Sequence, residues 1–218
     1  MLHKQTISPF LEEVLKRLMQ IKELKDFRLV GGTALSLLLG HRKSLDIDMF
    51  TAQYIKSNEL MHIMKLYYPR NEIRDISFGV QMYLPKPGTQ DELKVDLMCN
   101  EDYIRPVIEE EGIRIAQIED ISAMKLEAIT TRKEKKDYWD IAELLGIYSL
   151  DQLTIFYKER YPWNDLRAVM ENLLLFEKCD GQFDPECLNN KDWPMIKTII
   201  TKAFDKFVNH EKKRINPE

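Results

Sequence analysis

Three aspartates of this chain stand in apolar surroundings, where a carboxylate is costly without a partner. Asp46 and Asp48 belong to "SLDIDMF", and Asp96 belongs to "LKVDLM". Because residues i and i+2 of a strand point to the same face, Asp46 and Asp48 would repel each other unless a cation lay between them. Carboxylate oxygens suit Mg²⁺, and two such ions can activate an attacking oxygen and stabilise a leaving group. We therefore predict that Asp46, Asp48 and Asp96 bind two Mg²⁺ ions. The alternatives are that Asp46 and Asp48 lie on a solvent-facing strand surface, or that Asp46 caps a turn.

A segment suited to phosphate precedes these acids. Gly31 and Gly32 end the predicted strand "FRLVGG". The short predicted helix "TALSLLLGH" follows, so that Thr33 lies near the helix N-terminus and Gly40 can end the helix. Two glycines allow a sharp turn and bring backbone N–H groups close to a ligand, while a helix N-terminus favours an anion. We predict that Gly31, Gly32 and Thr33 hold the phosphates of a nucleotide.

The order "GGT", twelve residues, "DID" and a later "KVDLM" resembles the signature of the polymerase-β-type nucleotidyltransferase superfamily. More narrowly, "LVGGTALSLLLGHRKSLDIDMF" with "ISAMKLEAITTRKEKKDYWDIAELL" is similar to the AbiEii/AbiGii toxin family of abortive-infection and toxin–antitoxin systems, over residues 29 to 145. The resemblance implies Mg²⁺-dependent transfer of a nucleoside monophosphate from a nucleoside triphosphate (NTP), with pyrophosphate leaving. It also implies a tRNA 3′ end as the acceptor, growth arrest, and a separate antitoxin protein that restrains the enzyme.

The second motif places a lysine inside an apolar helical stripe. Lys125 shares this stripe with Ile121 and Ile129. By its residue type alone, Lys125 could bury its stem and extend its amine to solvent, whereas the resemblance implies contact with nucleotide phosphates and a part in catalysis. Asp137 and Asp140 share one helix face and could serve the helix dipole or salt bridges. The resemblance implicates an acid of this stretch in the active site; we choose Asp137 and expect Asp140 to orient the basic cluster.

Arg42 and Ser44 complete the predicted site before the acids. Arg42 could bind phosphate with two hydrogen bonds or pair with a carboxylate, and Ser44 could bond phosphate or cap the turn; both match the family pattern. Arg132 opens the run "RKEKK" and is also assigned to nucleotide binding. Charge runs on helices are usually solvated faces, but an RNA acceptor would need such a patch beside the acids. The patch predicted to bind RNA in a salt-sensitive way consists of Arg132, Lys133, Lys135 and Lys136.

The elements that would position these residues fall into two domains. In chain order we predict a helix within residues 10–27, a strand over 27–32, a helix over 33–41, a strand over 44–50, a helix over 57–68 and a hairpin of strands 76–84 and 92–99. Beyond residue 118 the pattern is nearly all helical. We therefore predict a nucleotidyltransferase core over residues 1–118 and a helical C-terminal domain over 119–218 that contributes active-site residues. The resemblance implies an α+β core, a mixed sheet with flanking helices.

Composition excludes several other classes. With 44% hydrophobic and 31% charged residues the chain is typical of globular proteins, and its formal charge of -4 provides no protein-wide attraction for nucleic acid. The sequence lacks the apolar region of a signal peptide and any run of about 18 to 20 apolar residues, so we expect a cytoplasmic protein that does not enter membranes. Three cysteines without a C-x-x-C pair are expected to be packing residues.

Two other functions are compatible with the sequence. Small-molecule nucleotidyltransferases, such as the aminoglycoside-modifying group, also resemble the "GGTAL…DID" half of the pattern. The chain could also be a nucleotide-binding or partner-binding module without turnover. Such a module would bind nucleotide with Mg²⁺ and release no pyrophosphate, and it would have no chemical need for three acids and Lys125.

Overall fold

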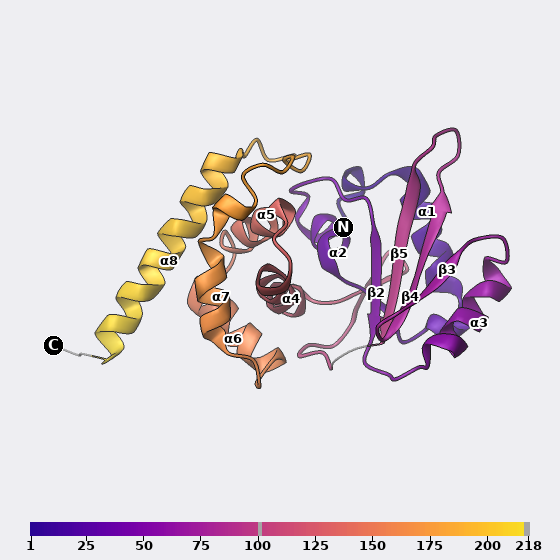
Figure 1. Cartoon of the computed structure of the whole chain (residues 1–218), viewed down its shortest axis with the longest axis horizontal. Coiled ribbons are helices and arrows are strands. Elements are labelled where there is room, and N and C mark those ends of the chain that lie inside the picture. Colours follow the sequence, from indigo (N-terminus) through magenta and orange to yellow (C-terminus); the bar gives the residue numbers. More distant parts are fainter. Residues whose placement is uncertain (100–101, 216–218) are drawn as a thin grey trace. The chain divides into compact units, whose positions relative to one another are not determined.

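The computed structural model describes residues 1–99 and 102–215. The contacts within the chain divide it into two compact units, residues 1–117 and residues 118–218, each of which is described by itself. Figure 1 shows that the first unit combines a sheet with helices and that the second is helical. The predicted α+β class is confirmed. In the described ranges, no helix is both long and apolar enough to cross a membrane.

A mixed sheet, with seven strands among the described residues, forms the centre of the first unit. The strands are β1 (Arg28–Leu29), β2 (Ile47–Thr51), β3 (Ile73–Ile76), β4 (Gly79–Pro85), β5 (Glu92–Cys99), β6 (Ile108–Glu110) and β7 (Ile113–Ile115). Their spatial order is β3-β4-β5-β2-β1-β7-β6. β2 is parallel to β5 and β1 is parallel to β7, while the other neighbours are antiparallel. The parallel pairing of β2 with β5 places two distant segments side by side.

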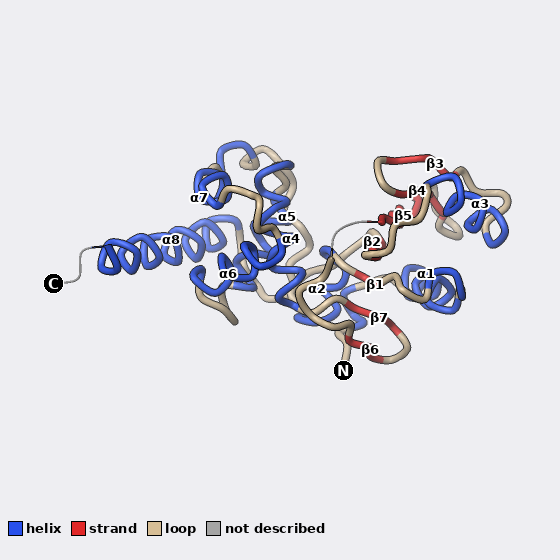
Figure 2. The backbone as a smooth tube through the Cα atoms, turned by 90° about the horizontal axis from the view of Figure 1, so that it is seen from below, coloured by secondary structure: helices blue, strands red, loops and turns tan. Residues whose placement is uncertain are grey.

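Helices cover both faces of this sheet. They are α1 (Pro9–Gln20), α2 (Gly31–Leu39) and α3 (Ser57–Tyr67), with short 3-10 turns at Lys4–Thr6 and Lys22–Leu24. α1 and α3 lie on one face, and α2 lies on the other (Figures 1 and 2). Ser8 caps α1 by accepting a hydrogen bond from the amide of Leu11, and Gly40 ends α2 with a left-handed φ of 71°. The predicted end of α2 at Gly40 is confirmed.

The two faces of the central strands differ in chemistry because side chains alternate along a strand. In β2, Ile47 and Met49 are buried, while Asp48 is half-buried on the opposite face. In β5, Val95 is buried on the first face, and Asp96 shares the second face with Asp48 through their direct pairing. The apolar face therefore forms the core beneath α1 and α3, and the acids point to the side of α2.

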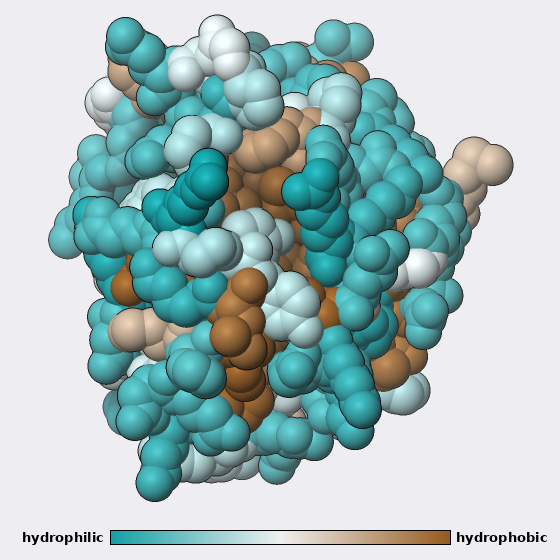
Figure 3. Space-filling model, turned by 90° about the vertical axis from the view of Figure 1, so that its right-hand side faces the viewer, coloured by the Kyte–Doolittle hydropathy of each residue, from teal (hydrophilic) through white to brown (hydrophobic). Residues whose placement is uncertain are grey.

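The outer surface near α3 and β3 is mostly polar. In Figure 3, viewed from the side on which α3 and β3 lie in Figure 1, hydrophilic side chains surround a narrow band of apolar ones. α3 buries Leu60 and Met64 and leaves Leu66 and Tyr67 exposed. Scattered exposed apolar residues of this kind are normal for a folded protein.

The second unit consists of helices packed around an aromatic cluster. They are α4 (Ile118–Thr131), α5 (Lys135–Leu144), α6 (Leu150–Arg160), α7 (Leu166–Leu173), a 3-10 turn at Phe176–Lys178, and α8 (Trp193–Ile215). Trp193 stacks on Trp139 with ring centroids 5.7 Å apart, and it meets Tyr138 edge-on at 5.8 Å. Aromatic pairs in these arrangements stabilise beyond their buried area, so this cluster joins the start of α8 to α5.

The strand predictions differ from the structure at four places. The strand predicted over 27–32 is only Arg28–Leu29, and Gly31 and Gly32 are the first residues of α2 and not the end of β1. The segment 76–84, predicted as one strand, contains a turn, because Phe78 adopts a left-handed φ of 63° between β3 and β4. β2 begins at Ile47, so Asp46 precedes the strand. The β6–β7 hairpin was not predicted; each of its strands has three residues. The predicted hairpin of the later strands is confirmed as β4 and β5.

Candidate functional site

Asp48 and Asp96 lie at the same level on adjacent parallel strands. They are direct partners in the register of β2 and β5. Neighbouring strands are about 4.8 Å apart, and partnered side chains point to the same face, so the two carboxylates are neighbours. Asp46 precedes β2 by one residue and is half-buried, as is Asp48, whereas Asp96 is 8% exposed. The structure therefore brings the acids of "DID" beside the acid of "KVDLM", as their motifs predicted.

The glycine pair lies against these acids and a buried arginine. A Cβ atom added to Gly31 would lie 2.7 Å from Oδ2 of Asp48, and Gly31 has a φ of 67° that other residues rarely adopt. A Cβ added to Gly32 would collide with the guanidinium of Arg42 and lie 3.6 Å from Oγ of Ser44. A Cβ at either position would therefore have to displace the side chain of Asp48 or Arg42, and the backbone conformation of Gly31 favours glycine as well.

The start of α2 is tied to the segment that carries Asp46. The hydroxyl of Thr33 donates to the backbone carbonyl of Asp46, and it lies 2.8 Å from Oγ of Ser44. The amide of Val30 donates to the carbonyl of Asp48 at 2.9 Å. Among the described residues, no side chain caps this helix, whose first N–H groups thus form the positive end of its dipole. Thr33 and Ser44 thus position the acidic segment, in addition to the phosphate contacts predicted for them.

Arg42 and Ser44 are held by their surroundings. Arg42 is 3% exposed and donates from Nη1 to the carbonyl of Lys43 at 2.9 Å. The amide of Ser44 donates to the carbonyl of Thr6 at 2.9 Å, and the amide of His3 donates to the carbonyl of Leu37 at 2.8 Å. The first residues of the chain therefore support both α2 and the loop that follows it.

Lys94 and Gln81, which motif reasoning missed, hold the two oxygens of Asp96. Nζ of Lys94 lies 2.6 Å from Oδ2, and Nε2 of Gln81 donates to Oδ1 at 3.0 Å. Burial alone would lower the pKa of Lys94, but Asp96, with Asp48 and Asp46 beyond it, raises this pKa above its ordinary value. The same-face rule that linked Asp46 to Asp48 also links Lys94 to Asp96, so the sequence contained the signal.

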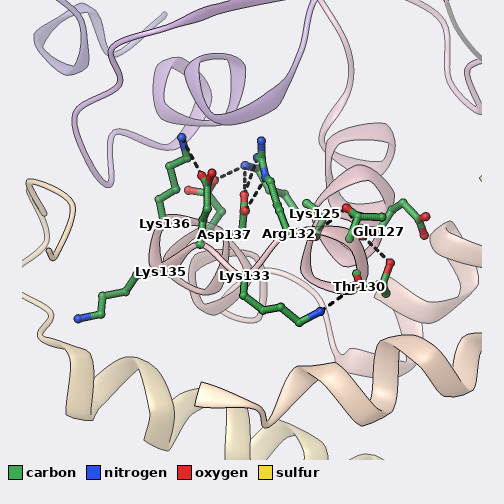
Figure 4. A network of polar contacts seen from close by, with 12 residues as sticks. Lys125, Glu127, Thr130, Arg132, Lys133, Lys135, Lys136 and Asp137 are labelled. Carbon is green, nitrogen blue, oxygen red and sulfur yellow. Dashed lines mark hydrogen bonds and ion pairs between the residues drawn. The ribbon is translucent and has the colours of Figure 1, made fainter. Parts of the chain in front are cut away.

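Lys125, in the second unit, forms ion pairs with Asp137 and Asp140. Its Nζ is 2.8 Å from Oδ1 of Asp137 and 2.7 Å from Oδ2 of Asp140, and its side chain is 3% exposed. Arg132 adds two contacts to Asp137, at 2.9 and 3.0 Å (Figure 4). Burial alone would raise the pKa of Asp137, but Lys125 and Arg132 outweigh it and hold this pKa below its ordinary value. At neutral pH the cluster therefore contains an ionised Asp137.

The predicted RNA-binding run is only partly accessible. Lys135 is 5% exposed, and its Nζ binds Oδ1 of Asp184 at 2.9 Å and the carbonyl of Gln182 at 2.6 Å. The prediction that Lys135 serves a solvent-facing patch is therefore wrong, since its charge is used to hold the loop before α8. Lys133 and Lys136 are half-buried, and they contact the Thr130 carbonyl and the Glu134 carboxylate respectively.

Another group of possible metal ligands lies on α6 and α8. Nδ1 of His210 is 2.8 Å from Oδ1 of Asp151, and Glu211 offers an oxygen within 4.8 Å of these ligand atoms. No pattern in the sequence joined these residues. Glu211 also pairs with Arg214, and His210 is exposed, as in many surface clusters that bind no ion.

The predicted site residues thus form two groups, one within each unit. The first unit holds Gly31, Gly32, Thr33, Arg42, Ser44, Asp46, Asp48 and Asp96, and the second holds Lys125, Arg132 and Asp137. The first group fits Mg²⁺ with a nucleotide, because it joins carboxylate oxygens to a glycine turn that a Cβ would fill and to an uncapped helix start. The second group is an ionic cluster in which Lys125 and Arg132 meet two buried carboxylates.

Comparisons with known proteins identify the family of the chain and proteins similar to it. The family model described as "Nucleotidyl transferase AbiEii toxin, Type IV TA system" matches residues 13–210. The chain is 28% identical over 176 residues to the uncharacterized protein aq_aa25 of Aquifex aeolicus (strain VF5), a match that covers 76% of this chain and 81% of that protein.

Two solved structures have a similar fold. JHP933 from Helicobacter pylori matches with a TM-score of 0.55 at 20% identity and covers 97% of this chain and 94% of its own. MenT4, the nucleotidyltransferase toxin Rv2826c from Mycobacterium tuberculosis H37Rv, matches with a TM-score of 0.57 at 13% identity, over 89% of this chain and 82% of its own. At these identities the likeness concerns the fold alone.

Proposed function

Since this chain belongs to the AbiEii nucleotidyl transferase toxin family of type IV toxin–antitoxin systems, and is therefore a nucleotidyltransferase, we propose that it transfers a nucleoside monophosphate from an NTP to the 3′ end of an RNA, in particular a tRNA. The reaction depends on Mg²⁺ and releases pyrophosphate. In this proposal the enzyme acts in the cytoplasm, where both substrates are present, and a separate antitoxin protein restrains it.

One observation carries the proposal: Asp48 and Asp96 are paired across β2 and β5, directly in front of the glycine turn that begins α2. Asp46, Asp48 and Asp96 are the residues that would hold two Mg²⁺ ions, which when bound neutralise phosphate charge and favour the ionised form of the attacking hydroxyl. The backbone N–H groups at the start of α2 bind phosphate oxygens, and the buried Arg42 keeps a positive charge behind Gly32.

The transfer makes one bond and breaks one. The 3′ oxygen of the acceptor forms a bond to the α-phosphorus, and the bond from this phosphorus to the oxygen of the pyrophosphate breaks. The hydroxyl proton passes to the Asp96 carboxylate and from there to solvent, while pyrophosphate leaves with the electron pair. Lys125 and Arg132, with Asp137 orienting them, are proposed from the family resemblance to stabilise negative charge that develops on the phosphates.

The test measures transfer of label to RNA. The protein is incubated with Mg²⁺, total tRNA and each α-labelled NTP in turn, in parallel with Asp48→Asn and with Asp75→Asn. Asp75 is an exposed strand acid of the same unit, which makes its variant a matched control. We expect wild type and Asp75→Asn to label tRNA, Asp48→Asn to be slower by at least about a hundredfold, and EDTA to stop the reaction.

Three other outcomes would contradict parts of the proposal. Full labelling by Asp48→Asn would remove this aspartate from the site and with it the proposed metal chemistry. Release of pyrophosphate without labelled tRNA would replace RNA by a smaller acceptor, which a screen of aminoglycosides tests directly. Nucleotide binding without pyrophosphate release under all conditions would make the chain a binding module.

A further inference from the structure

Lys94 provides a positive charge inside the group of acids that is proposed to bind metal. Its ammonium contacts Oδ2 of Asp96 at 2.6 Å, and its side chain is 34% exposed. Lys94 lies two residues before Asp96 in β5 and therefore on the same face as the paired Asp48. A cation is thus already present where carboxylates would otherwise repel one another.

The position of Asp96 is fixed from the other side by β4. Gln81 is the direct partner of Asp96 in the β4–β5 register and donates to its Oδ1 at 3.0 Å. The hydroxyl of Tyr83 in turn donates to Oε1 of Gln81 at 3.1 Å, which orients the amide. Gln81, Asp96 and Asp48 therefore lie in one row across β4, β5 and β2, and Lys94 occupies the second oxygen of the middle residue.

We propose that Lys94 is a positioning residue that acts as a resident counter-ion, so that metal binds to Oδ2 of Asp96 only in exchange for the ammonium of Lys94. A divalent ion and an ammonium that share one oxygen repel each other, and the partly exposed lysine side chain can turn toward solvent or toward a phosphate. Lys94 thereby stabilises the metal-free site and weakens metal binding to the protein alone. This inference rests on the proposed metal-dependent transfer.

The test measures metal binding rather than activity. Mn²⁺ replaces Mg²⁺, free Mn²⁺ is followed by electron paramagnetic resonance in the absence of nucleotide, and thermal melting in EDTA verifies that each variant is folded. The neutral variants are Lys94→Met, which keeps the apolar stem, and Lys94→Gln. Lys94→Arg keeps the charge, and Lys86→Met is the matched control in the β4–β5 turn, outside the acidic row.

We expect both neutral variants to bind Mn²⁺ at least about tenfold more tightly than wild type, and to melt at a lower temperature in EDTA. The Mn²⁺ affinities of Lys94→Arg and Lys86→Met should stay within about threefold of wild type. If the lysine acted only through its shape, Lys94→Arg would change the affinity as the neutral variants do, because arginine differs from lysine in shape. Equal or weaker Mn²⁺ binding by both neutral variants would overturn the proposal.

The Asp48→Asn variant distinguishes failure of the proposed metal site from failure of the role proposed for Lys94. If it binds Mn²⁺ more weakly than wild type while the Lys94 variants resemble wild type, the metal site stands and the role of Lys94 is refuted. If wild type and Asp48→Asn bind Mn²⁺ equally, the metal site itself is refuted, and the exchange at Lys94 with it.

Discussion

Lys125 neutralises two carboxylates inside the helical unit. It contacts Asp137 and Asp140, both fully buried, while Arg132 reaches Asp137 from a more exposed position. A buried charge that loses its partner is strongly destabilising, because the remaining charge has been removed from water without compensation. The lysine of the second motif therefore has a structural task as well as the catalytic one proposed for it.

The first prediction follows from this double task. Lys125→Met should lower the free energy of unfolding by about 3 to 5 kcal/mol, since it removes the cation that two buried carboxylates share. Lys125→Met combined with Asp140→Asn should recover a large part of this loss, because Arg132 still neutralises Asp137. Urea unfolding monitored by circular dichroism measures both. Equal instability of the single and double variants would contradict the ionic explanation.

The double variant also makes the catalytic role of Lys125 testable. Loss of transfer by Lys125→Met alone could reflect a damaged fold. If the stabilised double variant binds NTP normally but transfers slowly, the lysine acts on the phosphates during reaction.

The start of α2 combines a helix terminus, a left-handed backbone conformation that favours glycine, and a close contact. Gly31 has a φ of 67° and lies against Asp48, whereas Gly112, in the β6–β7 turn, has a φ of 76° and open space where a Cβ would be. The two glycines thus share a backbone conformation and differ in their surroundings. This difference separates the cost of the conformation from the cost of displacing the acid.

The second prediction compares Gly31→Ala with Gly112→Ala. Both should lose about 1 to 2 kcal/mol of stability, because a left-handed φ is costly for a residue with a Cβ. Only Gly31→Ala should also lose transfer and Mn²⁺ binding, since its methyl group must push the Asp48 carboxylate away. Labelling assays and thermal melting provide the comparison. Normal transfer by a folded Gly31→Ala protein would refute the close approach.

Elements with local signals were predicted well, and those without them were not. α2 ends at Gly40, where glycine supplies the left-handed conformation, and the prediction is confirmed. The turn between β3 and β4 has its positive φ at Phe78, a residue type that gives no such signal, so one strand was predicted in place of two. The strands of the β6–β7 hairpin are too short for an alternating pattern to be recognised.

The same contrast applies to the candidate site. The pairing of Asp48 with Asp96 could be expected because each acid sits in a recognisable strand within one family pattern. The partner of Lys135 is Asp184, on a loop 49 residues away, and no local pattern connects them. Lysine runs look alike in sequence whether they face solvent or hold a loop, so accessibility had to come from the structure.

The net charge of the chain limits which of its surfaces can attract RNA. The chain is acidic overall, with 36 acidic against 32 basic residues, so attraction for RNA must come from local groups. Within the run at 132–136, Lys135 is buried, whereas Lys133 and Lys136 are half-buried. These two lysines are thus the better candidates for contacts with phosphate.

The third prediction concerns the salt dependence of binding. Changing Lys133 and Lys136 to Gln should weaken tRNA binding and reduce the slope of log affinity against log salt by about 0.7 for each phosphate that the protein no longer neutralises. Lys135→Gln should instead lower the melting temperature and leave the slope unchanged, because Lys135 is bound to Asp184 and Gln182. Filter binding at several salt concentrations measures the slopes. An unchanged slope in the first variant would remove this run from RNA binding.

The insertion of β5 between β2 and β4 also bears on how the protein is made. Asp48 leaves the ribosome with β2, but its partner Asp96 emerges only after β3 and β4 have been synthesised. A nascent chain whose β5 is still inside the ribosome therefore exposes Asp48 but cannot yet pair it with Asp96. For an enzyme proposed to act on tRNA, translation itself sets the earliest moment at which the reactive centre can exist.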